Sequence, residues 1–367
     1  IIGAGIQEWF GDLIAKAGVI VSEWFSNMGA PELLVGFIDK GLFGGVGAVL
    51  SFLPLIMVMY FLLGLLEDSG YMARAAYVMD RLMRGLGLHG KTFVSMIVSV
   101  GCNVPGIMST RTLENKKDRM IAILINPFIS CGARMPIYAV FVEAFFPTHQ
   151  GLVLFSLYVL GIIVALISGK IFSKTLFKGE SSYFVMELPA YRMPSIKNVF
   201  LLMWEKAGAF FKKAGMIIFP MMIVLWALSV LPLGVEPNSE HSILGMIGSF
   251  VAPLFVLAGY GTWQAGVSLI TGILAKESVV ATMGMVYAGV EEGEALINVI
   301  QQVFTPLSAI SFLVMTLLYT PCLAALGAIK RETNSMKWTI FSAVYTFVIA
   351  LVLSTLVYQV GLLLGFQ

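Results

Sequence analysis

All three cysteines of the chain, Cys102, Cys131 and Cys322, lie where a long apolar run is interrupted by Gly or Pro. Proline removes a backbone hydrogen-bond donor and breaks a helix, so nearby carbonyl groups lose their helical partners. In lipid, such carbonyls are tolerated only where they face protein or a water-filled cavity. Thiols and backbone carbonyls together suit a soft or borderline metal cation. We therefore expect the three breaks to line a cation site.

Ionisable residues accompany these breaks. A fourth interruption, 275–278, carries Lys276 and Glu277, and Glu67 ends an apolar run. Charged groups inside a membrane are costly and mark either a pathway or an ion pair. For Arg134 and Lys276 we favour pairing with a carboxylate that fixes the helix register. For Glu67 and Glu277 we favour contact with a cation. The predicted cation ligands are Cys102, Cys131, Cys322, Asn103, Glu67 and Glu277.

Each of these features also has a simpler structural interpretation. A proline kink can serve helix packing alone, and an isolated membrane cysteine can act as a small apolar side chain. The coincidence of every cysteine with a break favours ligands. The chain has no Cys-x-x-Cys pair and only three histidines, so we expect no permanently bound metal or other cofactor. A transient, low-affinity cation site fits these residues better than a structural metal site.

Two short motifs resemble nucleotide-binding sequences. Residues 85–92, GLGLHGKT, match the phosphate-loop pattern, and residues 115–118, NKKD, match the guanine-reading pattern. A phosphate loop needs a buried strand before it and a soluble helix after it. Here an arginine-rich helical segment precedes the motif and an apolar run follows it. The two motifs are also too close together to enclose a GTPase domain, so we interpret both as chance matches.

The composition indicates a protein that crosses a membrane several times. Hydrophobic residues make up 58% of the 367 residues and charged residues only 12%, which is about half of the roughly 25% typical of soluble domains. Apolar runs of about 20 residues, long enough to cross a bilayer, recur along the chain. A net charge of +2 gives no reason to expect nucleic acid binding. Because the chain begins with Ile1, we expect a further segment to precede it.

The predicted fold is all-α and polytopic, with two repeats. The Lys and Arg residues of 171–213 and 330–337 place these segments in the cytoplasm. We divide the chain into amphipathic interfacial helices at 1–43, a first repeat at 44–170, a basic cytoplasmic linker with an amphipathic helix at 171–213, and a second repeat at 214–367. We expect spans near 44–66, 91–110, 119–146, 150–170, 214–233, 243–260, 263–287, 308–329 and 339–363, with 67–90 ambiguous.

The order of spans and breaks in one half recurs in the other. An odd number of crossings in each half would make the two halves inverted, and transporters of that kind bind their substrate near the midplane, where discontinuous helices meet. We therefore expect the breaks 101–106 and 275–278 to approach each other, with Cys102 and Glu277 facing one cavity. The alternative is that Lys276 neutralises Glu277 locally and the second half only scaffolds the first.

Five segments resemble the membrane domain of ferrous iron transport protein B, FeoB. The resemblance covers nearly the whole chain, with one departure, Gly106 where Ala would be expected. In that family the two halves are called Gate domains. The family's cysteines, matched here by Cys102, Cys131 and Cys322, are proposed to line the iron path. The segments are GCNVPGIMSTRTLEN (101–115), NPFISCGARMPIYAVF (126–141), ELPAYRMPSIKNV (187–199), AKESVVATMG (275–284) and YTPCLAALGAIKRE (319–332).

The resemblance implies two Gate-type repeats that carry Fe²⁺ into the cytoplasm across the bacterial inner membrane. It also implies that a GTPase domain, which this chain lacks together with its GTP and Mg²⁺, drives or gates transport. The chain itself is not expected to be an enzyme. The implied partners are Fe²⁺, the lipid bilayer and a small cytoplasmic protein like FeoA, and a homo-oligomer is left open.

Two alternatives remain at this stage. One is a Gate-type transporter of another solute such as a nucleoside, whose site would use polar and aromatic side chains in place of thiols. The other is an intramembrane enzyme, which would need a catalytic or metal-binding cluster. The histidines His89, His149 and His241 all lie near the ends of predicted spans, outside any such cluster.

Overall fold

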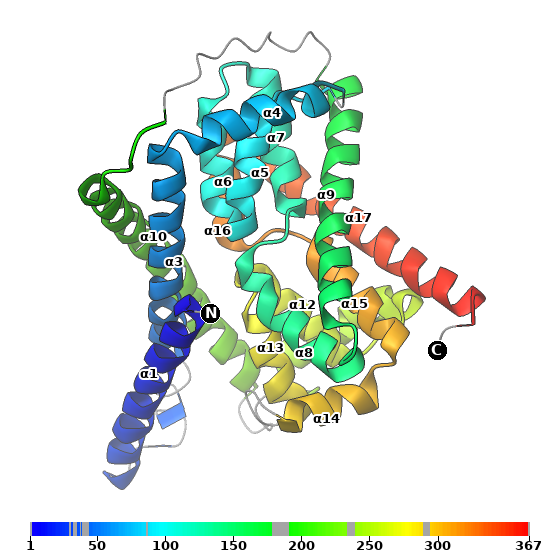
Figure 1. Cartoon of the computed structure of the whole chain (residues 1–367). Coiled ribbons are helices and arrows are strands. Elements are labelled where there is room, and N and C mark those ends of the chain that lie inside the picture. The colour runs from blue at the N-terminus through cyan, green and yellow to red at the C-terminus, as the bar shows by residue number, and fades with distance from the viewer. Residues whose placement is uncertain are drawn as a thin grey trace. The chain divides into compact units, whose positions relative to one another are not determined.

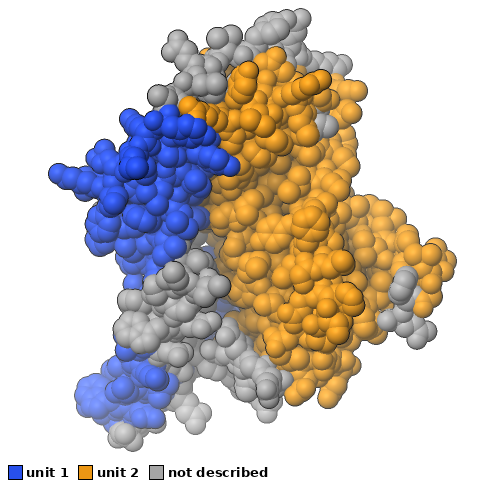
Figure 2. Space-filling model, in the orientation of Figure 1, with its two compact units in different colours: residues 1–72, 189–237 blue, residues 73–188, 238–367 orange. Residues whose placement is uncertain are grey.

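The structure is a computed structural model in which the chain forms two compact units, residues 1–72 with 189–237 and residues 73–188 with 238–367 (Figures 1 and 2). This division cuts across the two predicted repeats, because the first long helix of each repeat belongs to the first unit. The residues described are 2–28, 31, 35–36, 38, 44–85, 87–177, 191–232, 239–288 and 294–365.

The first unit contains three long helices, α1 (Ile2–Asn27), α3 (Gly44–Asp68) and α10 (Ile196–Val230). Both α1 and α10 pack against α3. The end of α3 is held to the start of α10 because Asp68 accepts a hydrogen bond from the backbone of Ser195 at 2.8 Å and pairs with Arg192. The prediction that the amphipathic helix within 171–213 and the span at 214–233 are two separate elements is wrong. They form one continuous helix of 35 residues.

The second unit contains the remaining elements, most of them short. Its long helices are interrupted where Gly and Pro were predicted to break them. In chain order they are α4 (Tyr71–Gly85), α5 (Lys91–Gly101), α6 (Asn103–Ser109), η2 (Thr110–Thr112), α7 (Lys116–Ile125), η3 (Asn126–Phe128), η4 (Gly132–Arg134), α8 (Met135–Phe145), α9 (Gln150–Lys174), α11 (Ile243–Val251), η5 (Ala252–Ala258), α12 (Trp263–Leu274), α13 (Ser278–Met283), the π-helix η6 (Gly284–Ala288), α14 (Glu294–Val303), α15 (Pro306–Leu318), α16 (Leu323–Thr333) and α17 (Met336–Leu363).

Four stretches of the described residues are long and apolar enough to cross a membrane. Two of them are broken helices at the centre of the unit: Lys116–Phe145, formed by α7 and α8, and Pro306–Thr333, formed by α15 and α16. In the most apolar stretch of each of these helices, 78% and 72% of the residues are buried, whereas the corresponding shares in α9 and α17 are only 28% and 22%. The broken helices therefore form the core, and α9 and α17 lie at its edge. These four spans confirm the prediction of a polytopic all-α membrane protein.

The outer face of α17 is apolar along most of its length. Side chains four residues apart, such as Ile340, Val344 and Val348, are each about half exposed. The opposite face presents small residues, including Ser342, Thr346 and Ala350, which are fully buried against the unit. An exposed apolar stripe beside a buried small-residue stripe is typical of a helix between lipid and protein. α17 is accordingly a lipid-facing helix.

The predicted spans 91–110 and 263–287 are wrong as crossings, because each forms a hairpin of short helices. α5 has 11 residues and is about 16 Å long, roughly half the thickness of the hydrocarbon core. The chain reverses at Cys102, and α6 folds back so that Gly106 packs against Ser95 and Ser99 of α5. In the second hairpin, the hydroxyl groups of Thr271 in α12 and Thr282 in α13 lie 3.0 Å apart.

The two hairpins enter the unit from opposite ends. Arg111, which follows α6, and Arg119, near the start of α7, bind the same carboxylate, so the first hairpin opens at the end where α7 begins. Gln301 of α14, which follows the second hairpin, donates to the backbone of Ala144 at the end of α8. The second hairpin therefore opens at the end where α8 finishes. Since α7 and α8 form one span, the tips point toward each other, as inverted repeats require.

The ambiguous segment 67–90 and its counterpart 243–260 also do not form straight spans. α4 is an amphipathic helix of 15 residues that follows a turn at Gly70, where φ is 78°. α11 and η5 are 9 and 7 residues long and are followed by a bend of 103° before α12. Each precedes a hairpin, so this part of the repeat is also preserved in both halves.

Replacing Gly106 should test the first hairpin. An added Cβ would lie 1.8 Å from Ser99 Oγ and 3.0 Å from the backbone oxygen of Ser95. We expect Gly106→Ala to lower stability by about 1–3 kcal/mol, as overpacking commonly does. Gly327→Ala in α16 is the matched control, because nothing lies within 4 Å of its added Cβ. The measurement is thermal unfolding in detergent, and equal melting temperatures for the two variants would contradict the folded-back hairpin.

Candidate functional site

Cys102 forms the tip of the first hairpin. Its backbone is extended, with φ −152° and ψ 133°, and it ends α5 while it begins α6. The neighbouring Asn103 is buried, and one end of its side-chain amide lies 3.0 Å from the backbone oxygen of Ser99 and 3.2 Å from that of Ile129. Because both neighbours are acceptors, we assign that end as the amide nitrogen, which donates to them. Asn103 therefore fastens the hairpin tip to the next break. Only its side-chain oxygen remains suited to a cation, which narrows the ligand role predicted for it.

Cys131 lies in the extended segment that interrupts the first broken helix. Gly132 follows it, and a Cβ there would lie 3.4 Å from the backbone oxygen of Gly101, so the hairpin tip abuts this break. Arg134 is fully buried and donates to the backbone oxygens of Pro127 and Ile129, each at 3.2 Å. Our prediction that Arg134 pairs with a carboxylate is wrong. Its guanidinium instead satisfies the carbonyl groups that the break releases.

Lys276 lies at the tip of the second hairpin and reaches the second broken helix. Its side chain is buried, and its ammonium donates to the backbone oxygen of Thr320 at 2.7 Å. The same nitrogen lies 3.1 Å from the centre of the Tyr319 ring, in a cation–π contact. The carboxylate pairing predicted for Lys276 is therefore replaced by a carbonyl and a ring. Cys322 follows Pro321 in the same break and begins α16 in an extended conformation.

These breaks lie close enough to interact electrostatically. Cys102 interacts with Cys131, Cys322 and Glu277. Lys276 interacts with Cys131 and Cys322 as well as with its neighbour Glu277. Cys102 and Cys322 are partly buried and Cys131 is buried. The structure thus brings four of the predicted ligands into one neighbourhood, which is the approach of the two hairpin tips that the repeat predicts.

The predicted ligands are not assembled into a finished metal site. Among the described residues, no group of three or more His, Cys, Asp or Glu side chains is arranged so that it could hold a metal ion. The backbone carbonyls that the two helix breaks leave without helical partners already bind cationic side chains, namely Arg134 at the first break and Lys276 at the second. A cation that binds here must therefore draw the ligands together and compete with resident positive charge.

The site is closed toward the end of the unit where α7 begins. A cluster of buried apolar side chains from α6, α7 and α16 lies next to Cys322 and Val104. Beyond it, Glu332 at the end of α16 receives hydrogen bonds from Arg111 at 2.8 and 2.9 Å and from Arg119 at 2.9 Å. The hydrogen bonds and charge of Glu332 raise the pKa of Arg111. The apolar cluster consists of Ile107, Ile123, Ala325, Ala328 and Ile329.

Sequence reasoning missed the ion cluster of Arg111, Arg119 and Glu332. Arg111 and Glu332 are 221 positions apart, and no local pattern links them. Glu332 was interpreted only as part of a basic cytoplasmic segment. Its side chain is 1% exposed and lies beside the two arginines. Both facts come from the tertiary structure, so the sequence offers no signal for this cluster.

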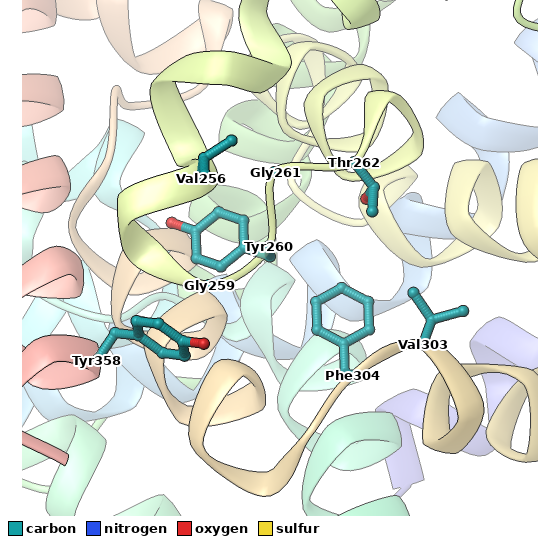
Figure 3. A pocket seen from close by; sticks show the side chains of 8 residues that line it. All are labelled: Val256, Gly259, Tyr260, Gly261, Thr262, Val303, Phe304 and Tyr358. Carbon is teal, nitrogen blue, oxygen red and sulfur yellow. The ribbon is translucent and has the colours of Figure 1, made fainter. Parts of the chain in front are cut away.

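A separate hollow of about 320 Å³ lies beside the loop between η5 and α12 (Figure 3). None of the predicted ligands lines it, and none of its lining side chains is a thiol or a carboxylate. Tyr260, Phe304 and Tyr358 give it an aromatic surface. The other lining residues are Val256, Gly259, Gly261, Thr262 and Val303. This hollow therefore lacks the chemistry of a metal site.

Comparison with known families and proteins adds an independent result. The Gate family, described as nucleoside recognition, matches residues 49–145 and 211–336, and a family described as ferrous iron transport protein B C terminus matches residues 154–206. A protein named Fe(2+) transporter FeoB from Staphylococcus aureus strain MSSA476 is 49% identical over 335 residues, which are 91% of this chain and 50% of the relative. The chain belongs to the FeoB family of ferrous iron transporters.

Other FeoB relatives give the same result. The Fe(2+) transporter FeoB of Methanocaldococcus jannaschii is 41% identical over 98% of this chain and 54% of its own length. A fusion of Fe(2+) transport protein A with FeoB from Porphyromonas gingivalis is 38% identical over 99% of this chain and 48% of its own length. The chain thus spans about half the length of these relatives. No solved structure matches it.

Glu67 stands apart from the other predicted FeoB site residues. It belongs to the first unit, in the last turn of α3, and its side chain is exposed. Its role as a cation ligand stays a prediction. Glu67 lies next to Asp68, which pairs with Arg192 and so fixes the end of α3.

The phosphate-loop-like motif does not have the structure of a phosphate loop. Helix α4 precedes it and α5 begins at Lys91, so no strand lies where one is needed. Its backbone N–H groups also have partners, since Gly90 donates to Asp80 at 3.1 Å and Lys91 to His89 Nδ1 at 3.1 Å. Asn115, in the second motif, caps α7 by accepting from the backbone of Lys117. These contacts favour chance resemblance.

Lys91→Ala should therefore leave nucleotide affinity at background. Lys91 lies 3.8 Å from Glu114, whose side chain is 92% exposed, and an exposed pair of this kind contributes little. Equilibrium binding of a fluorescent GTP analogue to the purified chain measures the affinity. Saturable binding that the substitution abolishes would overturn this interpretation.

Glu332→Gln should destabilise the protein, because it leaves two arginines without their shared counter-charge. The arginine side chains are 46% and 33% exposed and can be hydrated, so we expect a loss of about 1–3 kcal/mol, below that of a fully buried ion pair. Glu114→Gln is the matched control, since its carboxylate is exposed and makes one long contact. Thermal unfolding in detergent would distinguish them, and a Glu332→Gln protein as stable as the control would show that the cluster contributes little to closure.

Proposed function

We propose that this chain carries Fe²⁺ across the bacterial inner membrane into the cytoplasm. The observation that supports this most directly is the gathering of Cys102, Cys131, Cys322 and Glu277 at the facing hairpin tips and helix breaks of two inverted repeats. Fe²⁺ accepts thiolate, carboxylate and carbonyl ligands together, whereas the harder ions Mg²⁺ and Ca²⁺ take oxygen ligands. The names of the relatives agree with this assignment of the substrate.

The incomplete state of the site fits transport better than storage. A transported ion must be bound well enough to enter and weakly enough to leave. Thiols bind metal as thiolates, so arrival of Fe²⁺ releases protons from the cysteines. The negative charge formed in this way offsets the resident charges of Arg134 and Lys276. The ligand set is then complete only while the ion is present.

Closure at one end fits a transport cycle in which the site opens to one side at a time. The apolar cluster beside Cys322 and the ion cluster around Glu332 separate the thiols from the end where α7 begins. Lys170 and Lys174 of α9 and Lys330 and Arg331 of α16 also lie toward this end. By the positive-inside rule we assign it to the cytoplasm, so the described state is closed inward.

Further components belong to the proposal. We infer that a GTPase domain outside this chain drives or gates the opening, because the chain matches only about half of each relative. A small partner like FeoA is supported by the relative in which Fe(2+) transport protein A is fused to FeoB. The chain itself is proposed to have no catalytic site of its own.

Transport of a nucleoside is the alternative that one observation favours, namely the description of the matching Gate family as nucleoside recognition. The aromatic hollow of Figure 3 has the polar and aromatic lining that such a solute would need. It contains no residue of the thiol cluster, however, and a nucleoside has no use for three converging cysteines. Uptake of labelled nucleosides, measured beside Fe²⁺ uptake, separates the two functions.

Cys102→Ser should cut Fe²⁺ uptake about tenfold or more while the protein still folds, because a hydroxyl replaces the thiolate at the hairpin tip. The protein, expressed from its complete gene in bacteria without another ferrous iron uptake system, is tested with labelled Fe²⁺ under anaerobic, reducing conditions. Cys131→Ser and Cys322→Ser should act in the same direction. Ser109→Ala is the control, since its hydroxyl only donates within its own helix turn. Normal uptake by well-folded Cys102→Ser would remove Cys102 from the pathway.

A further inference from the structure

Lys276 occupies a position that has the character of a cation site. Its ammonium contacts the backbone oxygen of Thr320 at 2.7 Å and the face of the Tyr319 ring at 3.1 Å. Thr320 lies between the end of α15 and the start of α16, where its carbonyl has no helical partner. A carbonyl at a helix break and an aromatic face are groups that bind inorganic cations. Here a side chain from the opposite hairpin fills this position.

The ammonium also lies among the proposed iron ligands. Lys276 is 2% exposed, and it interacts electrostatically with the guanidinium of Arg134 first, and then with Cys322, Cys131 and Glu277. A cation entering this group therefore meets a fixed positive charge that already holds one of the carbonyl ligands. The equivalent break in the other half has the same arrangement, because Arg134 holds the carbonyls of Pro127 and Ile129. Lys276 differs in coming from the other hairpin, so it can leave when that hairpin moves.

We propose that Lys276 is a tethered cation that makes the site selective for divalent over monovalent ions. This rests on the proposed function as a transporter of a divalent metal. An entering ion must take the Thr320 carbonyl from an ammonium that is already in place. Na⁺ or K⁺ carries no more charge than that ammonium and must also lose its hydration shell. Replacing the ammonium by such an ion therefore brings no favourable free energy. A divalent ion gains twice the attraction to Glu277 and to the thiolates, and displaces the ammonium.

A purely structural role for Lys276 makes different predictions. In that case the hydrogen bond to Thr320 matters and the charge does not. Lys276→Gln separates the two, because the amide still donates a hydrogen bond but carries no charge. Lys276→Arg keeps both the charge and the donor. Lys276→Met removes both while it retains an unbranched side chain of similar bulk.

The experiment measures Tl⁺ flux, as a probe for K⁺, and Fe²⁺ flux in parallel in proteoliposomes that contain the protein purified from its complete gene, so that the inferred GTPase domain is present. We expect Lys276→Gln and Lys276→Met to raise the Tl⁺ flux at least tenfold above that of the unchanged protein, and to make Fe²⁺ flux sensitive to added K⁺. Lys276→Arg should exclude Tl⁺ as before. Tl⁺ exclusion that persists in folded Lys276→Gln would overturn the proposal.

Variants of Tyr319 provide a second test of the same contact. Where substitution at 276 prevents folding, Tyr319→Leu is measured in its place, because it removes the ring that helps to hold the ammonium at the Thr320 carbonyl, so that an entering monovalent ion displaces the ammonium more easily. A rise in Tl⁺ flux supports the proposal, and unchanged exclusion contradicts it. Tyr319→Phe is the control that retains the ring. A third outcome separates the two proposals. If no protein carries Fe²⁺ and only the uncharged variants leak Tl⁺, iron transport is rejected, while the role of Lys276 as a tethered cation is supported.

Discussion

Backbone groups released by a helix break inside a membrane have no water to bind, and each must find a partner within the protein. The second unit meets this constraint at four breaks in one region. Extended residues such as Cys102 and Cys131 begin new helical turns there, and the carbonyls of Pro127, Ile129 and Thr320 are paired with side chains. Because those partners are charged or polar, the same region becomes a polar neighbourhood between the two broken helices. The position of the candidate site follows from this requirement.

The two halves meet the constraint with different geometry. In the first, Arg134 folds back onto carbonyls five and seven residues earlier in the same span. In the second, Lys276 crosses from a hairpin to a carbonyl 44 residues later. A guanidinium has five donors in a rigid plane and stays charged, whereas an ammonium is a compact charge on a flexible stem. The first break is therefore held by its own helix, and the second depends on contact between separate elements.

Much of this architecture could be predicted from the sequence, because local Gly and Pro residues determine where a helix is interrupted. Pro105, Pro136 and Pro321 mark where helices cannot continue, and the repeated order of breaks predicts inverted halves. Two things could not be predicted. Runs 91–110 and 263–287 have the length and apolarity of spans, and only long-range packing folds them into hairpins. The partners of Arg134, Lys276 and Glu332 are likewise set by tertiary contacts, since carboxylate and carbonyl partners satisfy a buried cation equally well on sequence grounds.

The folded-back hairpins have a mechanical consequence. A helix that crosses the membrane is anchored at both surfaces, so shifting it along its axis drags polar flanking residues into lipid. The α5–α6 and α12–α13 hairpins each enter and leave at one surface, and their tips, Cys102 and 275–277, carry no such anchor. Moving a tip away from the centre breaks only the contacts that hold it there, such as those of Asn103 and Lys276, and leaves the four spans of the second unit in place. The proposed cycle of alternating access would then need movement of two short hairpins and not of the lipid-facing helices α9 and α17.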